Sequence, residues 1–242
     1  MYFSEIFERP NIMLDNKTLT YLKDLKKNNH KEWFDLNRDR YEEELDKVRT
    51  FAEDVLQNMR AFDEIETKSG RKSLQRIYRD VRFSKNKTPY KTHWGGGFKR
   101  ATKLKRGGFY YHIEPGNSFI GGGFWGPSSK DLLHLRKQMA SDPESIRKIL
   151  NSNAFKNSFG ELRGEQVKTA PKGFSKEDPA IDLLRFKQFL VKKDFTDAQV
   201  KTPGFSKEVA QGFREMLPFF NLMSDLLTHD LNGTPIPEEH LP

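Results

Sequence analysis

Hydrophobic positions recur at helical spacing near the start of the chain. One stripe consists of Tyr41, Leu45, Val48, Ala52, Val55 and Met59, which are separated by steps of three or four residues. This spacing predicts a long helix over 31–60. A leucine pattern predicts a shorter helix over 18–27. Asn28 and Asn29 lie between the two helices and are typical of a turn.

The pattern changes to alternation in the middle third. Hydrophobic residues alternate with polar ones over 76–83, which predicts a β-strand. Residues 109–113 alternate in the same way, and residues 114–117, Glu-Pro-Gly-Asn, have the composition of a turn. Residues 118–125 then return as a second strand, so the sequence predicts a β-hairpin here.

Helical patterns return after Gly126. Proline suits the first turn of a helix, and an aspartate before it suits the N-cap position. Helices are therefore expected to start at Pro127, at Asp142-Pro143 and at Asp178-Pro179, the last with Leu184 and Leu190 on its apolar side. We expect Ser206 to cap a final long helix that Pro218 kinks.

The remaining segments complete the predicted architecture. Glycine and proline make 160–179 a loop with one short strand at 166–169, while 191–195 is expected as an edge strand and 232–242 as a loose tail. The whole pattern predicts a single α+β domain over 1–242. Its sheet is mainly antiparallel, comes from the middle third, and is packed by helices from the N- and C-terminal thirds.

The composition of the chain excludes several kinds of catalytic site and of protein. The chain has 242 residues and no cysteine, which excludes disulfides, thiolate catalysis and iron–sulfur clusters. Residues 1–14 contain no apolar core of an export signal, and no apolar run approaches the roughly 20 residues that span a bilayer. We therefore expect a soluble cytoplasmic protein that has no membrane partner.

Known cofactor and metal motifs are missing from the sequence. The glycine triplets 95–97 and 121–123 form neither a dinucleotide fingerprint nor a phosphate loop. The six histidines include no pair at a zinc-binding spacing, so we expect no metal and no cofactor.

Positive charge is concentrated in one segment. Residues 68–106 contain fourteen Lys and Arg and one acid, Asp80, whereas 1–67 is acidic. Such a segment attracts phosphates, nucleic acid or acidic protein. The candidate ligand-binding residues in it are Arg76, Arg79, Arg82, Lys85, Lys87, Tyr90 and Lys91.

The predicted strand divides these residues between two faces. Arg76 and Arg82 share a face with Asp80, and arginine forks suit phosphate or carboxylate. Arg79 falls among apolar residues and, if buried, needs a carboxylate, for which the candidates are Glu32, Asp35 and Asp39. The alternative is a purely structural network, in which the acidic segment neutralises these cations within the fold.

A second group of polar residues lies on the predicted hairpin. Tyr110, His112 and Glu114 alternate onto one face, where Glu114 could orient His112 as a general base. The candidate catalytic residues are therefore Asp80, Tyr90 and His112, although a histidine among sheet aromatics is commonly only a hydrogen-bonded surface residue.

The central string also carries a resemblance to a known family. Its residues Arg76, Arg79, Asp80, Arg82, Phe83, Asn86, Lys87 and Tyr90 match the hallmark Arg-x-x-Arg-Asp-x-Arg-Phe-x-x-(Asp or Asn)-Lys-x-x-Tyr. The chain thus resembles the uncharacterised family called domain of unknown function 2461. The resemblance implies a single domain of this length and no known reaction or ligand.

Three functional classes follow from these observations. The first is an anion-binding domain that recognises a phosphorylated ligand or nucleic acid through the cluster at 76–91. The second is an enzyme acting on an anionic substrate. The third is a protein-interaction domain with a structural Arg-Asp-Arg network.

Overall fold

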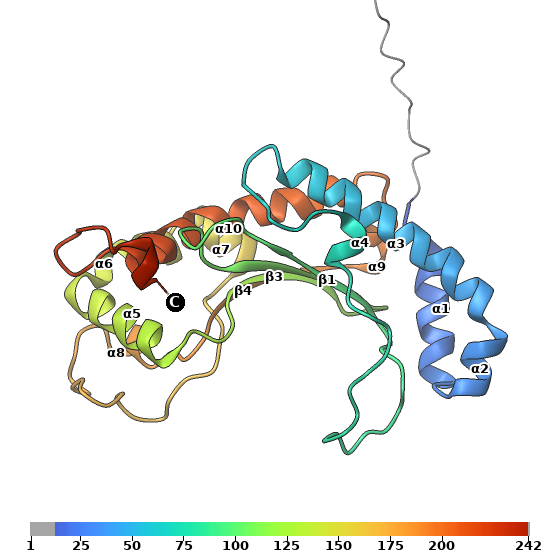
Figure 1. Ribbon diagram of the computed structural model, residues 1–242, viewed down its shortest axis with the longest axis horizontal. Coiled ribbons are helices and arrows are strands. Elements are labelled where there is room, and N and C mark those ends of the chain that lie inside the picture. Colours follow the sequence, from blue (N-terminus) through green and yellow to red (C-terminus); the bar gives the residue numbers. More distant parts are fainter. Residues whose placement is uncertain (1–12, 242) are drawn as a thin grey trace, which may run out of the picture.

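A four-stranded antiparallel sheet lies at the centre of the molecule (Figure 1). The computed structural model describes residues 13–241. Its strands, adjacent in chain order, are β1 (Trp94–Lys99), β2 (Gly108–Ile113), β3 (Ser118–Phe124) and β4 (Phe189–Phe195). The β2–β3 pair confirms the predicted hairpin, and β4 confirms the predicted last strand.

Helices precede and follow the strands along the chain. They are α1 (Asn16–Lys27), α2 (Lys31–Leu36), α3 (Arg38–Met59), α4 (Gly70–Ser73), α5 (Ser129–Ser141), α6 (Pro143–Leu150), α7 (Asn153–Phe159), α8 (Ile181–Leu184), α9 (Asp197–Val200), α10 (Phe205–Thr228) and the 3-10 helix η1 (Glu238–His240). Some of them pack on the sheet and others on neighbouring helices. α3 and α10 cover one face, where Tyr111 of β2 packs edge-on against Phe51 of α3. Within residues 13–241 no helix covers the opposite face (Figure 1). The predicted α+β class is confirmed.

The outer edges of the sheet meet segments of the same chain. Along β1, the backbone of residues 64–75 pairs at Leu74 with Gly96 and at Ile65 with Arg100. At β4, Arg163 and Leu190 exchange two backbone hydrogen bonds of 2.8 Å.

The structure corrects several predicted helix boundaries. The helix predicted over 31–60 is two helices, because the chain breaks at Asn37, which ends α2 and precedes α3. The N-cap of α5 is Ser128, whose hydroxyl accepts the amide of Asp131, so Pro127 lies outside the helix. α10 begins at Phe205, before Ser206, and continues through Pro218.

Of the other predictions for the C-terminal half, one is confirmed and two are wrong. Asp142 and Pro143 start α6 as predicted, and the side chain of Asp142 accepts two backbone amides. α8 ends at Leu184, and Leu190 belongs to β4 instead. The short strand expected at 166–169 is a single bridge between Gln166 and Phe186.

The sequence also makes predictions for the two ends of the chain and for membrane spans. The sequence predicts that residues 1–14 contain no export signal. The first twelve of these residues lie outside the described part of the chain. The sequence predicts a loose tail over 232–242. The Leu241 side chain in this tail is nevertheless buried, with 4% of its surface exposed. No helix in residues 13–241 is both long enough and apolar enough to cross a membrane.

Candidate functional site: the basic loop and the uncovered sheet face

Residues 76–91, here called the basic loop, project from the sheet on the side away from α3 and α10 (Figure 1). The predicted strand over 76–83 is wrong. Only Tyr78 forms a bridge, and its partner is Tyr90 of the same loop. The amide of Arg79 donates to Pro89 and the amide of Lys91 to Ile77, both at 2.8 Å. These backbone groups find partners within the loop, so the segment does not join the sheet.

The base of the loop is fixed to the turn between α1 and α2. The Asn29 side chain donates to the carbonyl of Tyr90 at 2.9 Å and accepts its amide at 3.0 Å. The ring of Tyr90 stacks on Phe34 at 4.2 Å between centroids and is 4% exposed. Tyr90, a candidate ligand-binding and catalytic residue in the sequence, therefore positions the loop. The sequence identifies Asn29 only as a turn residue.

Hydrogen bonds within the loop hold its outer part. Arg82 pairs with Asp80 through two bonds, of which the shorter is 2.7 Å. Arg79 donates to the carbonyl and the hydroxyl of Thr88 and pairs with none of the three helix carboxylates expected for it. The Lys87 ammonium donates to the carbonyl of Val81 at 2.9 Å.

Most cations of the basic loop have no acidic partner. Within the described residues, no carboxylate forms an ion pair with Arg76, Arg79, Lys85, Lys87 or Lys91. Arg82 is the exception, and its guanidinium keeps the pKa of Asp80 below its usual range. Burial and the nearby Arg76 lower the pKa of Lys91. Five of the six cations of the loop therefore have no carboxylate within ion-pair distance among the described residues.

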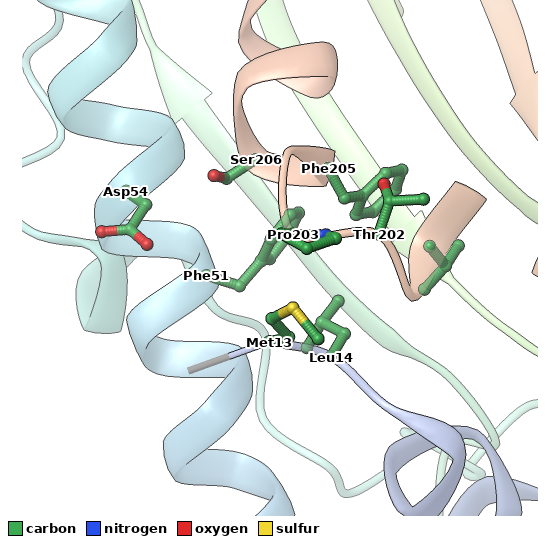
Figure 2. Close-up of a pocket in the computed structure, with 9 residues that line it drawn as sticks. Met13, Leu14, Phe51, Asp54, Thr202, Pro203, Phe205 and Ser206 are labelled. Carbon is green, nitrogen blue, oxygen red and sulfur yellow. The ribbon is translucent and has the colours of Figure 1, made fainter. Parts of the chain in front are cut away.

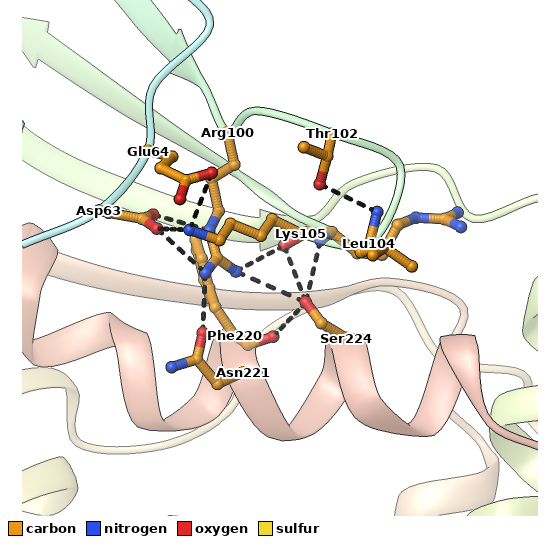
Figure 3. Close-up of polar contacts among 10 residues, drawn as sticks. Asp63, Glu64, Arg100, Thr102, Leu104, Lys105, Phe220, Asn221 and Ser224 are labelled. Carbon is orange, nitrogen blue, oxygen red and sulfur yellow. Dashed lines mark hydrogen bonds and ion pairs between the residues drawn. The ribbon is translucent and has the colours of Figure 1, made fainter. Parts of the chain in front are cut away.

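Four cations of residues 99–106, in contrast, pair with carboxylates of the same chain (Figure 3). Arg100 is 3% exposed and donates to Asp63 at 2.7 Å, to Asn221 at 2.7 Å and to the carbonyl of Arg106 at 3.1 Å. Four further ion pairs join Lys99 to Glu66, Lys105 to both Asp63 and Glu64, and Arg106 to Asp131. The structural network considered from the sequence thus includes Lys99, Arg100, Lys105 and Arg106 and leaves the basic loop outside it.

A row of polar side chains crosses the uncovered sheet face. The Tyr110 hydroxyl lies 3.1 Å from His112 Nδ1, and His112 Nε2 lies 3.1 Å from Glu114 Oε2. The His112 ring, 8% exposed, stacks on His93 at 4.1 Å between centroids and on Phe119 at 4.7 Å. His93 follows the basic loop closely in sequence, so this row lies next to the base of the loop.

The protonation states in this row follow from its surroundings. Burial lowers the pKa of His112, against the opposing effect of Glu114, and lowers that of His93 to about 4. Burial also opposes ionisation of Glu114, but hydrogen bonds from Asn117 and His112 outweigh it and keep the pKa of Glu114 low. A neutral His112 that donates from Nε2 to ionised Glu114 can accept the Tyr110 proton at Nδ1.

Cavities occur elsewhere in the molecule. One of about 20 Å³ lies between α3 and the start of α10, with Phe51 and Phe205 in its wall (Figure 2), and it has room for about one water. Spaces of about 400 and 610 Å³ open beside Trp125 and beside Arg100. None of these three is lined by a residue of the basic loop. Among residues 13–241 no three His, Cys, Asp or Glu side chains gather as a metal site would require.

Comparison with known proteins supports the resemblance noted in the central string. No curated protein and no solved structure matches the chain. A family model does match, over residues 17–221, a range that includes the basic loop, the sheet and most of α10. The chain belongs to the family described as conserved hypothetical protein DUF2461.

Proposed function

We propose that this chain binds a phosphate-bearing polyanion, of which nucleic acid is the best example, through the basic loop. One observation carries the proposal. Of the six Lys and Arg in the loop, Arg82 alone pairs with a carboxylate among the described residues. Arg76, Lys85 and Lys87 are also exposed. Unpaired, exposed cations gain by contact with phosphates, because binding releases the counterions of the polyanion.

The position of the cations favours a polyanion over a small phosphorylated ligand. They are distributed along a projecting loop, from Arg76 and Lys91 at its two ends to Lys85 near its middle. A small ligand is normally enclosed in a pocket of several hundred Å³. Spaces of about 400, 470 and 610 Å³ lie beside Trp125, Pro203 and Arg100, and no residue of the loop lines them.

The test is the salt dependence of binding to a labelled single-stranded oligonucleotide. Changing both Lys85 and Lys87 to Ala should weaken binding and reduce the slope of log affinity against log salt by about 0.7 for each phosphate that the loop no longer neutralises. The control changes Lys148 and Lys156 to Ala. Both are exposed lysines, on α6 and α7, and their replacement removes the same net charge. Equal reductions of affinity in the two double variants would contradict a role for the loop.

A second candidate function rests on the Tyr110–His112–Glu114 row. Two hydrogen bonds of 3.1 Å align a phenol, an imidazole and a carboxylate, an arrangement that can relay a proton. If the ligand is also a substrate, His112→Gln should abolish hydrolysis of a chromogenic phosphate ester and leave oligonucleotide binding unchanged. Wild-type protein without hydrolytic activity would contradict this second function and leave the first standing.

A further inference from the structure

One aromatic side chain of the basic loop has no packing role. Phe83 is 97% exposed, the highest exposure of any large hydrophobic residue in the described part of the chain. Arg82 precedes it and Lys85 follows two positions later, and the guanidinium of Arg82 lies 6.0 Å from the centre of its ring. Tyr78, at the base of the same loop, is 49% exposed.

The loop is built to hold Phe83 in this position. The amide of Ser84 donates to the carbonyl of Val81 at 3.3 Å, which closes a turn around residues 82 and 83. The Lys87 ammonium donates to the carbonyl of Val81 at 2.9 Å and lies 3.5 Å from that of Arg82. Asp80 fixes Arg82 on the other side of the turn. A ring displayed on a preorganised turn loses little conformational entropy when it binds.

We propose that Phe83 stacks on an unpaired base while the loop cations contact the adjacent phosphates, so that the ligand is single-stranded nucleic acid. This inference rests on the proposed function. Base stacking on aromatic side chains beside a basic track is the general mode of single-strand binding, because every base offers a π face. The bases of a duplex are already stacked on one another and cannot offer that face at the loop tip.

An anionic membrane is the other surface that could receive an aromatic ring among cations. Membrane-bound segments bury a continuous apolar face. Phe83 is the one large apolar side chain exposed at the loop tip, where Arg82, Lys85 and Lys87 surround it in sequence. The arrangement therefore favours phosphates interspersed with single bases.

The test compares Phe83→Ala with wild type on four probes: a short oligothymidylate, the same strand in a duplex, base-free inorganic polyphosphate, and phosphatidylserine vesicles. Wild type should prefer the single strand to the duplex. Phe83→Ala should lower affinity for oligothymidylate about tenfold, the typical effect of removing one stacked aromatic ring. Its affinity for polyphosphate should not change, because the cations remain. Phe83→Tyr keeps the ring and should restore binding to oligothymidylate.

The outcomes separate the two proposals. If wild type binds neither oligothymidylate nor polyphosphate, the proposed function fails and this inference with it. If wild type binds both but Phe83→Ala changes neither affinity, or changes both equally, only the role of Phe83 is overturned. If Phe83→Ala lowers the affinity for the vesicles only, the ligand is a membrane surface and not nucleic acid. Unfolding does not confound the comparison, because an exposed ring contributes little to stability; equal melting temperatures verify this.

Discussion

Arg82 and Arg100 show how burial decides the role of an arginine. Each lies 2.7 Å from an aspartate oxygen, but the Arg82 side chain is 77% exposed and that of Arg100 is 3% exposed. Solvent screens the exposed pair, so its contribution to folding is small. The buried guanidinium has instead been removed from water, and its stability depends on Asp63, Asn221 and the carbonyl of Arg106.

Substitution of the two arginines should therefore separate stability from binding. Arg100→Ala leaves Asp63 buried without its main partner and should lower the free energy of unfolding by about 3–5 kcal/mol. Arg82→Ala should leave stability nearly unchanged but weaken oligonucleotide binding. Urea unfolding together with a binding titration measures both quantities. A large drop in the stability of Arg82→Ala without a change in binding would mean that the loop pair is structural.

His93 should make stability depend on pH. The groups that face it are His112, Glu114 and Lys91, and burial with His112 lowers its pKa from 6.5 to about 4 in the folded protein. The unfolded chain therefore binds the proton more tightly, and the stabilising effect is fully present above pH 6.5 and is lost as the pH falls toward 4. Because His93 is only partly buried, solvent screens these interactions, and the decrease in stability attributable to this residue is less than about 3 kcal/mol.

The measurement is the unfolding free energy of wild type and of His93→Gln over this pH range. Other groups titrate in both proteins, so the difference between them isolates His93. The wild-type curve should fall more steeply below pH 6.5 than the variant curve. Parallel curves would show that His93 is protonated with ordinary affinity in the folded state.

At the scale of elements, the basic loop is a projection whose base contacts the α1–α2 turn and α2. Asn29 satisfies both the amide and the carbonyl of Tyr90, and the Tyr90 ring stacks on Phe34 of α2. The Asn29 side chain takes the place of a neighbouring strand. It joins two residues that are 61 positions apart in the sequence. The turn therefore holds the base of the loop, together with the backbone bond from the amide of Gln75 to the carbonyl of Gly95.

Asn29→Ala should release the base of the loop. It removes two hydrogen bonds and leaves the Tyr90 backbone without partners, which should cost about 1–3 kcal/mol of stability. Hydrogen exchange at the Tyr90 amide should accelerate, while exchange in β2 and β3 stays slow. Asn28→Ala is the matched control, because the Asn28 side chain bonds within α1, to the carbonyl of Asp24. Unchanged exchange at Tyr90 in Asn29→Ala would contradict this account.

At the scale of the whole molecule, the sequence predicts which helices and strands form the layers better than it predicts where each of them begins and ends. Apolar periodicity identifies α1 and α3, and alternation identifies β2 and β3, because the buried face of each element imposes its period. The same alternation misassigns residues 76–83, since period two does not reveal whether a neighbouring strand is available. Charge alone locates the candidate loop, but the burial of Tyr90 and the exposure of Phe83 depend on packing.

The pairing of residues 64–75 along β1 also affects the behaviour of the molecule in concentrated solution. An open strand edge offers unsatisfied amides and carbonyls to any other chain, and this is the usual starting point of aggregation. Here the edge is occupied at Leu74 and at Ile65 by the same chain. A second copy must displace this segment before it can add a strand next to β1. A glycine-rich edge strand has few side chains to deter such pairing, and the covering segment from the chain itself supplies that protection instead.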